Sequence, residues 1–122
     1  VRDTPSIKLL TMLTTDARVA DTIIEMRHDS PGKVFFILDS NHTRAHVLAE
    51  LALLRSVVLP GDYLVVEDGN INGHPVLPGW GDGPTEALRA YFEMHPCDYT
   101  VDSRREAKFG FTFAPSGFLV RN

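Results

Sequence analysis

Cysteine is nearly absent from this sequence. Cys97 is the single cysteine among 122 residues, so no internal disulfide can form, and this usage fits a reducing cytoplasm. No apolar run approaches the roughly 20 residues of a membrane-spanning helix, and residues 1–5 lack the apolar core of a secretory signal. We therefore expect a cytoplasmic protein with no membrane partner, in which Cys97 is a partly buried structural thiol.

Positive charge is also scarce. Lysine and arginine number 12 against 16 aspartates and glutamates, and the formal net charge is −4. Proteins that bind nucleic acid through its phosphates usually show the opposite balance, so we expect no nucleic-acid partner. The length suffices for one hydrophobic core and is too small for two. We expect a single domain over residues 1–122.

Two apolar runs predict buried parallel strands. Residues 33–38 and 63–66 each follow a turn signal that contains Pro-Gly. Neither run alternates polar and apolar side chains, so we expect helices on both faces of the sheet. Between the runs, apolar residues recur at helical spacing from Val47 to Val58, with Thr43 as a candidate cap. Strand, helix and strand in this order predict a right-handed βαβ unit.

The flanking segments extend the α/β pattern. Pro84 is well placed in the first turn of a helix, and Phe109, Phe111 and Phe113 alternate as in a half-exposed strand. The further elements expected are a strand at 7–12, helices starting near Asp16 and at Gly83-Pro84, and strands at 99–101 and 109–113. We therefore expect an α/β fold that ends in an antiparallel strand pair.

One long loop stands apart from these elements. Residues 69–83 hold five of the nine glycines and two of the eight prolines, together with His74 and Trp80. Loops of this length in compact domains are often lids or binding loops. A merely flexible surface loop is the alternative.

Both central strands run directly into acidic residues. Asp39 follows the first, and Glu67 and Asp68 follow the second. Ligands of open α/β sheets bind outside the carboxyl ends of the strands, and neighbouring strands lie about 4.8 Å apart, so these carboxylates should converge. Their mutual repulsion would be relieved by a divalent cation such as Mg²⁺. The alternative is that Asp39 caps a turn while Glu67 and Asp68 face water.

His42, three residues after Asp39, is a candidate catalytic base because histidine titrates near neutral pH. The alternative is a simple surface histidine at the start of a helix. His42 and His46 also have the spacing of a zinc-binding helix. Residues 43–45 lack the glutamate of a zinc protease, which excludes that motif.

Two blocks together resemble a known family. DSNH at 39–42 and VVEDGNINGHPV at 65–76 resemble the cephalosporin hydroxylase / rhamnosyl O-methyltransferase family. The resemblance covers residues 33–121, and a fainter match reaches back to Ile7. It implies the Rossmann-like fold of class I S-adenosylmethionine-dependent methyltransferases.

The same resemblance implies a mechanism. Mg²⁺ would be held at Asp39, Glu67 and Asp68 and would lower the pKa of an acceptor hydroxyl on a natural product or sugar. A base would stand at His42 and remove the hydroxyl proton, after which the alkoxide would attack the methyl of S-adenosylmethionine. His74 and Trp80 would bind the acceptor, in a loop that closes over it.

The cofactor motifs of that fold have no counterpart here. No glycine-rich turn stands ahead of Ile7, so the chain resembles the fold from its third strand onward, with the first two strands absent. The family's strand order, 3-2-1-4-5-7-6, would then leave residues 33–38 with an exposed edge, and exposed edges pair with what is available. We expect a longer polypeptide or a homo-oligomer formed by strand exchange, with the S-adenosylmethionine site largely outside this chain.

The sequence therefore predicts the C-terminal, metal- and acceptor-binding half of a Mg²⁺-dependent O-methyltransferase, inactive alone. A noncatalytic binding or assembly module that keeps the half-fold is the alternative. A phosphoryl-transfer enzyme with an aspartyl nucleophile ranks last, because residues 40–42 supply no second aspartate close behind Asp39.

Overall fold

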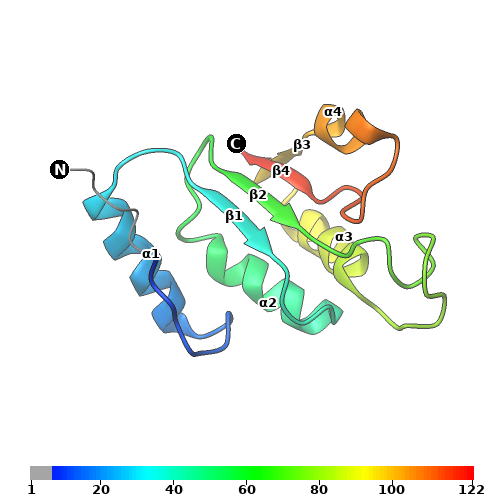
Figure 1. The fold of residues 1–122 in the computed structure, drawn as a ribbon, viewed down its shortest axis with the longest axis horizontal. Helices are drawn as coiled ribbons and strands as arrows, with labels where there is room; N and C mark the ends of the chain where they lie inside the picture. The colour runs from blue at the N-terminus through cyan, green and yellow to red at the C-terminus, as the bar shows by residue number, and fades with distance from the viewer. Residues whose placement is uncertain (1–6) are drawn as a thin grey trace.

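The computed structural model describes residues 7–122; residues 1–6, which include the segment compared with secretory signals, lie outside it (Figure 1). In chain order the elements are α1 (Ala17–Asp29), β1 (Phe35–Leu38), α2 (Arg44–Leu54), β2 (Tyr63–Val66), α3 (Pro84–Met94), β3 (Tyr99–Val101), α4 (Ser103–Glu106), the 3₁₀ helix η1 (Ala107–Phe109) and β4 (Phe118–Arg121). The expected α/β class is confirmed. Among residues 7–122, no helix has both the length and the apolar character needed to cross a membrane.

The strands form one mixed, four-stranded sheet in the order β1-β2-β4-β3. β1 and β2 are parallel, with Phe35 beside Tyr63 and Leu38 beside Val66. β4 is antiparallel to both β2 and β3. The expected antiparallel pair at the C-terminal end is therefore present, but β3 pairs with residues 118–121 and not with the expected strand at 109–113. The observed order corresponds to the 4-5-7-6 part of the strand order that the resemblance implies, and β1 lies at one edge (Figure 1).

Local sequence signals explain where the helices begin. The carboxylate of Asp16 caps α1 by accepting a hydrogen bond from a first-turn backbone N–H at 3.0 Å. α3 begins at Pro84, where the missing N–H of proline does no harm. Oε2 of Glu86 accepts a hydrogen bond from the backbone N–H of Gly83 at 2.7 Å. Thr43 occupies the predicted cap position of α2, but its side chain makes no capping hydrogen bond.

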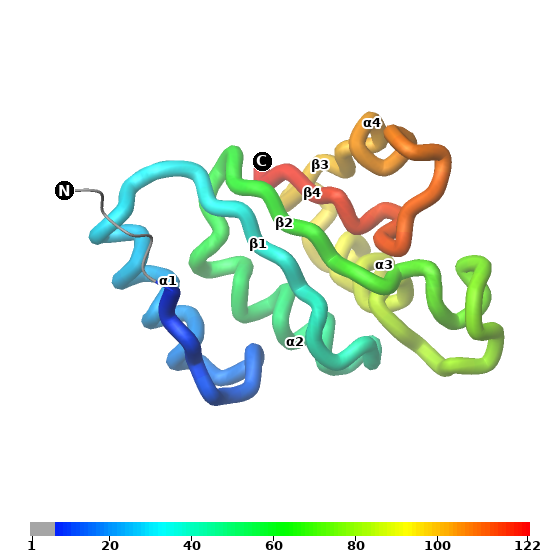
Figure 2. Tube along the Cα trace, viewed as in Figure 1, coloured from blue at the N-terminus to red at the C-terminus, as the bar shows by residue number. Residues whose placement is uncertain are grey.

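The hydrophobic core lies between the sheet and one layer of helices. Leu51 of α2 and Tyr91 of α3 are fully buried against Leu64 of β2 and Leu119 of β4. Figures 1 and 2 show α2 and α3 packed across the same face of the sheet, with α1 beside β1. α1 contributes partly buried apolar side chains to this core. Burying each large apolar side chain contributes roughly 1.5–3 kcal/mol before the entropy cost.

The opposite face of β1 is open, which corrects the expectation of helices on both faces. Phe35 and Ile37 point to that face and are 58% and 57% exposed. Farther across the sheet, Arg105 of α4 lines a shallow pocket with Tyr63 and Phe118. In the described part of the chain, the three long helices all contribute to the other face, so β1 keeps an uncovered side.

Three other expectations are wrong. Residues 7–12 have irregular backbone and pair with no strand of the described residues, and Ile7 is 95% exposed. Residues 109–113 form no strand: η1 ends there and the chain turns at Gly110, whose φ is 71°. Cys97 is exposed in the turn between α3 and β3.

β4 reaches its place beside β2 through a close backbone approach at Gly117. A Cβ at this position would lie 2.3 Å from the carbonyl oxygen of Val66. The backbone N–H of Val66 donates to the carbonyl oxygen of Gly117 at 2.9 Å. Only glycine allows this contact, which supports the end of β2 next to the acidic residues.

Candidate metal centre

The parallel pairing of β1 and β2 brings two acidic segments together. The backbone N–H of Glu67 donates to the carbonyl oxygen of Leu38 at 3.0 Å, one residue beyond the paired strands. Each strand therefore delivers its next residue, Asp39 or Glu67, to the carboxyl end of the sheet. Asp68 follows with a φ of 55°, so the backbone turns in a left-handed conformation at this point.

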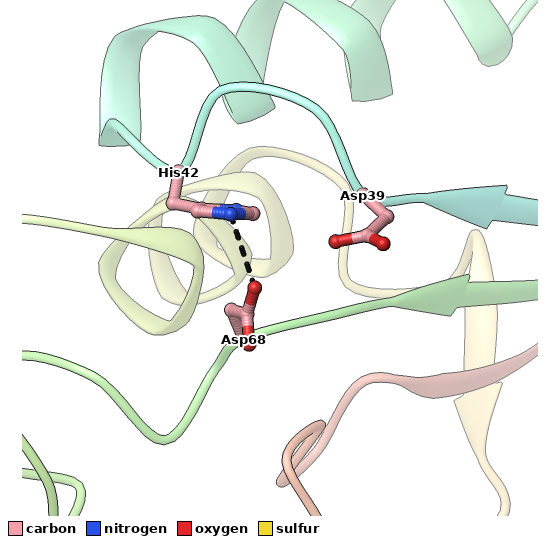
Figure 3. A group of neighbouring side chains, drawn as sticks. All are labelled: Asp39, His42 and Asp68. Carbon is pink, nitrogen blue, oxygen red and sulfur yellow. Dashed lines mark ion pairs between the residues drawn. The ribbon is translucent and has the colours of Figure 1, made fainter.

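Three of the predicted side chains meet there. Asp39, His42 and Asp68 each offer one ligand atom, and these atoms lie within 4.8 Å of one another. Figure 3 shows both carboxylates and the imidazole facing a shared space, with Nε2 of His42 3.0 Å from Oδ2 of Asp68. Ligands of an octahedral Mg²⁺ ion, at about 2.1 Å from it, lie roughly 3–4 Å apart. The 3.0 Å between His42 and Asp68 falls within this range, and the 4.8 Å limit for the whole group lies slightly above it.

The loop that carries His42 is held by side-chain hydrogen bonds on both sides. Oδ1 of Asn41 accepts from the backbone N–H of Thr43 at 3.1 Å, which bends the chain into α2. Oγ of Ser40 donates to Oε1 of Glu50, in α2, at 2.6 Å. The sharp entry into the helix thereby returns His42 toward the strand ends.

Glu67, the third predicted ligand, is not a member of the group formed by Asp39, His42 and Asp68. Burial, followed by the negative charges of Asp39 and Asp68, raises the pKa of Glu67 above its ordinary value. Crowding of like charges at a strand end is the condition that a bound cation relieves. The oxygen-rich donors therefore fit a hard divalent cation, with Asp39 and Asp68 common to a set completed by His42 or by Glu67.

His74, in the loop after β2, lines a cavity of about 760 Å³. Its Nε2 lies 2.6 Å from Oε1 of Glu86. Burial by itself raises the pKa of Glu86, but hydrogen bonds from the backbone of Gly83 and from the side chains of His74 and Asn72 outweigh burial and lower it to about 2. An ionised Glu86 thus fixes the imidazole at the cavity wall. The apolar part of the lining is Leu88, Phe92, Val101 and Pro115.

One residue of the cavity lining is hydrogen-bonded to the backbone next to the candidate metal ligands. Oγ1 of Thr85, in the cavity lining, donates to the carbonyl oxygen of Gly69 at 2.6 Å, and Gly69 directly follows Asp68. Trp80, the second predicted contact of a substrate, is 55% exposed and does not line this cavity. The structure thus brings His74 to a ligand-sized space and leaves Trp80 on the outer part of the loop.

Sequence reasoning missed two glutamates that support these sites, although each had a signal. Glu86 stands three residues after Gly83, where a glutamate commonly caps the start of a helix. Glu50 is a charged residue within the apolar face of α2, which also includes Val47, Leu51 and Leu54. A charge at a buried helical position indicates a specific partner.

Comparison with known proteins identifies the family. The family model described as rhamnosyl O-methyltransferase/CmcI matches residues 2–122. The chain belongs to this family. Rhamnosyl O-methyltransferases of Mycobacterium tuberculosis (strain H37Rv) and Mycobacterium bovis (strain BCG) are 54% identical to it over 121 residues, 99% of this chain and 49% of theirs. The rhamnosyl O-methyltransferase of Mycobacterium leprae is 51% identical over 117 residues, 96% of this chain and 51% of its own.

This chain therefore spans about half the length of the curated relatives that it matches. No solved structure matches it significantly. Membership in the rhamnosyl O-methyltransferase/CmcI family confirms the resemblance seen in the blocks at 39–42 and 65–76. A methyltransferase family implies S-adenosylmethionine as the methyl donor.

Proposed function

We propose that this chain is the metal- and acceptor-binding half of an S-adenosylmethionine-dependent O-methyltransferase that acts on a hydroxyl of a sugar or sugar-bearing natural product. One observation carries the proposal: Asp39, His42 and Asp68 converge at the ends of two parallel strands. They do so in a chain 54% identical to rhamnosyl O-methyltransferases, whose name specifies a sugar acceptor.

In the proposed mechanism, Asp39, Glu67 and Asp68 would hold Mg²⁺, and His42 would stay free of the metal as the base. A divalent cation bound there supplies Lewis-acid chemistry that lowers the pKa of an acceptor hydroxyl, and S-adenosylmethionine supplies the methyl group. Nε2 of His42 lies 3.0 Å from Oδ2 of Asp68. An imidazole that carries its proton on Nε2, facing this carboxylate, would keep the lone pair of Nδ1 to receive the hydroxyl proton. His42 thereby acts as the general base, oriented by its contact with Asp68.

The cavity beside His74 is the proposed acceptor site. Its volume of about 760 Å³ lies within the range usual for small-molecule sites. His74, Thr85, Arg89 and Ser116 offer hydrogen-bonding groups in its lining. Trp80 belongs to the same loop, and we propose that movement of this loop brings it over the acceptor.

The open edge of β1 is the proposed contact with the remainder of the protein. Phe35 and Ile37 are exposed apolar side chains on an edge strand, whose backbone can accept another strand. Either the rest of a longer polypeptide or a second copy of this chain would cover them, and most of the S-adenosylmethionine site would lie there. A cytoplasmic location accords with the composition.

The same open edge supports a second candidate, a noncatalytic binding or assembly module that keeps the half-fold. Such a module would use the apolar surface at Phe35 and Ile37 and would have no need of metal at Asp39 and Asp68. Metal binding therefore separates the two candidates.

Isothermal titration of the 122-residue chain with Mg²⁺ and Mn²⁺ tests the proposal. We expect one site, weakened at least tenfold by Asp39→Asn or Asp68→Asn. Asp21→Asn, which removes the same charge from an exposed position of α1, should leave it unchanged. Absence of metal binding would favour the module, and tight S-adenosylmethionine binding by this chain alone would contradict the placement of the cofactor site.

A further inference from the structure

Glu50 is a buried carboxylate to which the proposed mechanism gives no role. It is 1% exposed and lies on the face of α2 that packs into the hydrophobic core. Its Oε2 atom is buried and has no hydrogen-bond partner among the described residues. Because burying a carboxylate is costly unless specific contacts compensate it, this position calls for an explanation beyond packing.

The carboxylate of Glu50 contacts the loop that carries two of the candidate metal ligands. Its Oε1 accepts a hydrogen bond from Oγ of Ser40 at 2.6 Å, and Ser40 directly follows Asp39. Nε2 of His46 lies 3.4 Å from the same Oε1 and 3.1 Å from Oγ1 of Thr14. Oε1 of Glu50 thus contacts the metal-binding loop and His46 of its own helix, and His46 in turn contacts Thr14 in the segment that precedes α1.

We propose that Glu50 is a positioning residue of the metal centre. Through Ser40, it fixes the loop over residues 39–42 and so sets where Asp39 and His42 stand relative to Asp68. The inference rests on the metal site proposed above.

The carboxylate of Glu50 anchors Ser40 to the packed helix α2. A hydrogen bond to a carboxylate is roughly twice as strong as one between neutral groups, and this carboxylate stands on a helix packed into the core. Without it, Ser40 and the residues on either side would be held by the exposed Asn41 turn and by the pairing of Glu67 with Leu38. Residues that orient metal ligands from behind typically alter metal affinity by 10–100-fold when removed.

The test measures Mn²⁺ binding to the full 122-residue chain by the loss of the free-ion electron paramagnetic resonance signal. A second readout is the Mn²⁺-induced broadening of the His42 imidazole resonances. We expect Glu50→Ala and Ser40→Ala each to weaken binding about 10–100-fold and to reduce the broadening. The double variant should bind no more weakly than Glu50→Ala, because both changes remove one interaction.

Two further variants separate positioning from general stability. Glu50→Gln keeps a carbonyl oxygen that can accept from Ser40, and it should restore part of the affinity that Glu50→Ala loses. Val57→Ala removes buried methyl groups just beyond α2, away from Ser40, and should leave Mn²⁺ affinity unchanged while lowering the unfolding temperature. Ser40→Ala leaves the core intact, so it keeps the test valid even where Glu50→Ala fails to fold.

Full Mn²⁺ affinity in Ser40→Ala would overturn the positioning role of Glu50, and so would an equal loss of Mn²⁺ affinity in Val57→Ala and Glu50→Ala. Neither result would contradict the metal site itself. Failure of the unmodified chain to bind Mn²⁺ would overturn the metal site, and the positioning role with it.

Discussion

Loss of the negative charge at Glu86 is expected to destabilise the start of α3 and release His74. Oε2 of Glu86 accepts from the backbone of Gly83 at 2.7 Å, and Oε1 faces Nε2 of His74 at 2.6 Å and Nδ2 of Asn72 at 3.4 Å. The side chain is 17% exposed, so these contacts act on a charge largely removed from water. Glu86→Gln keeps the size of the side chain and removes that charge.

The size of the expected loss of stability follows from the pKa of Glu86, which the structure lowers from 4.5 to about 2. A shift of that size corresponds to at most roughly 3 kcal/mol of folding free energy. Because the pKa is lower in the folded state, the contribution is complete above the unfolded value and is lost as the pH falls from about 4.5 toward 2. Glu86→Gln should therefore be less stable than the unmodified chain near neutral pH, with a difference that shrinks in acid.

Urea unfolding followed by circular dichroism, from about pH 6 to about pH 2.5, measures this difference. Glu93→Gln makes the same substitution at an exposed position of the same helix and should change stability by less than about 0.5 kcal/mol at either pH. An equal pH dependence of stability in Glu86→Gln and the unmodified chain would show that Glu86 makes no such contribution and refute the reasoning.

Three other substitutions have definite expected outcomes. Gly117→Ala should cost about 1–3 kcal/mol in thermal unfolding, since its Cβ would lie 2.3 Å from the carbonyl oxygen of Val66; an unchanged melting temperature would contradict this. Ile37→Lys should lower self-association in sedimentation velocity, because it places a charge on the open edge strand; unaltered association would show that β1 is not the surface through which copies associate. Asp98→Asn should cost about 2 kcal/mol in urea unfolding, because the carboxylate accepts from the hydroxyl of Tyr91 at 2.7 Å and pairs with two arginines; a loss below about 0.5 kcal/mol would contradict it.

The elements that the sequence predicted well are those with a strong local pattern. The apolar run at 63–66 matches β2 residue for residue, and the helical spacing after Thr43 matches the start of α2. The strands predicted at 7–12 and 109–113 failed for a common reason. Each has a plausible strand pattern, but a strand exists only where another offers it a ladder of hydrogen bonds, and that partner is a property of the whole fold.

The candidate site likewise contains residues that the sequence predicted and one residue whose position it predicted wrongly. Two apolar runs that are followed by acidic residues predicted that Asp39 and Asp68 would meet. The DSNH block placed His42 three residues after Asp39. Glu67 was expected to be an equal partner, and the structure leaves it outside the group within 4.8 Å. The parallel ladder and the left-handed φ of 55° at Asp68 determine which carboxylate faces His42.

The sequence by itself determined the α/β class, the parallel βαβ unit, the family and the acidic ends of the two central strands, because these follow from short-range periodicity and from contiguous motifs. Only the tertiary structure decided that His42 pairs with Asp68, that His74 is held by Glu86, and that Ser40 is held by Glu50. These pairings join residues 10 to 26 positions apart in the chain, and their geometry depends on how α2, α3 and the strand ends pack. Successive side chains of an extended chain point in opposite directions, so the packing of the whole domain selects which acidic residue reaches the site.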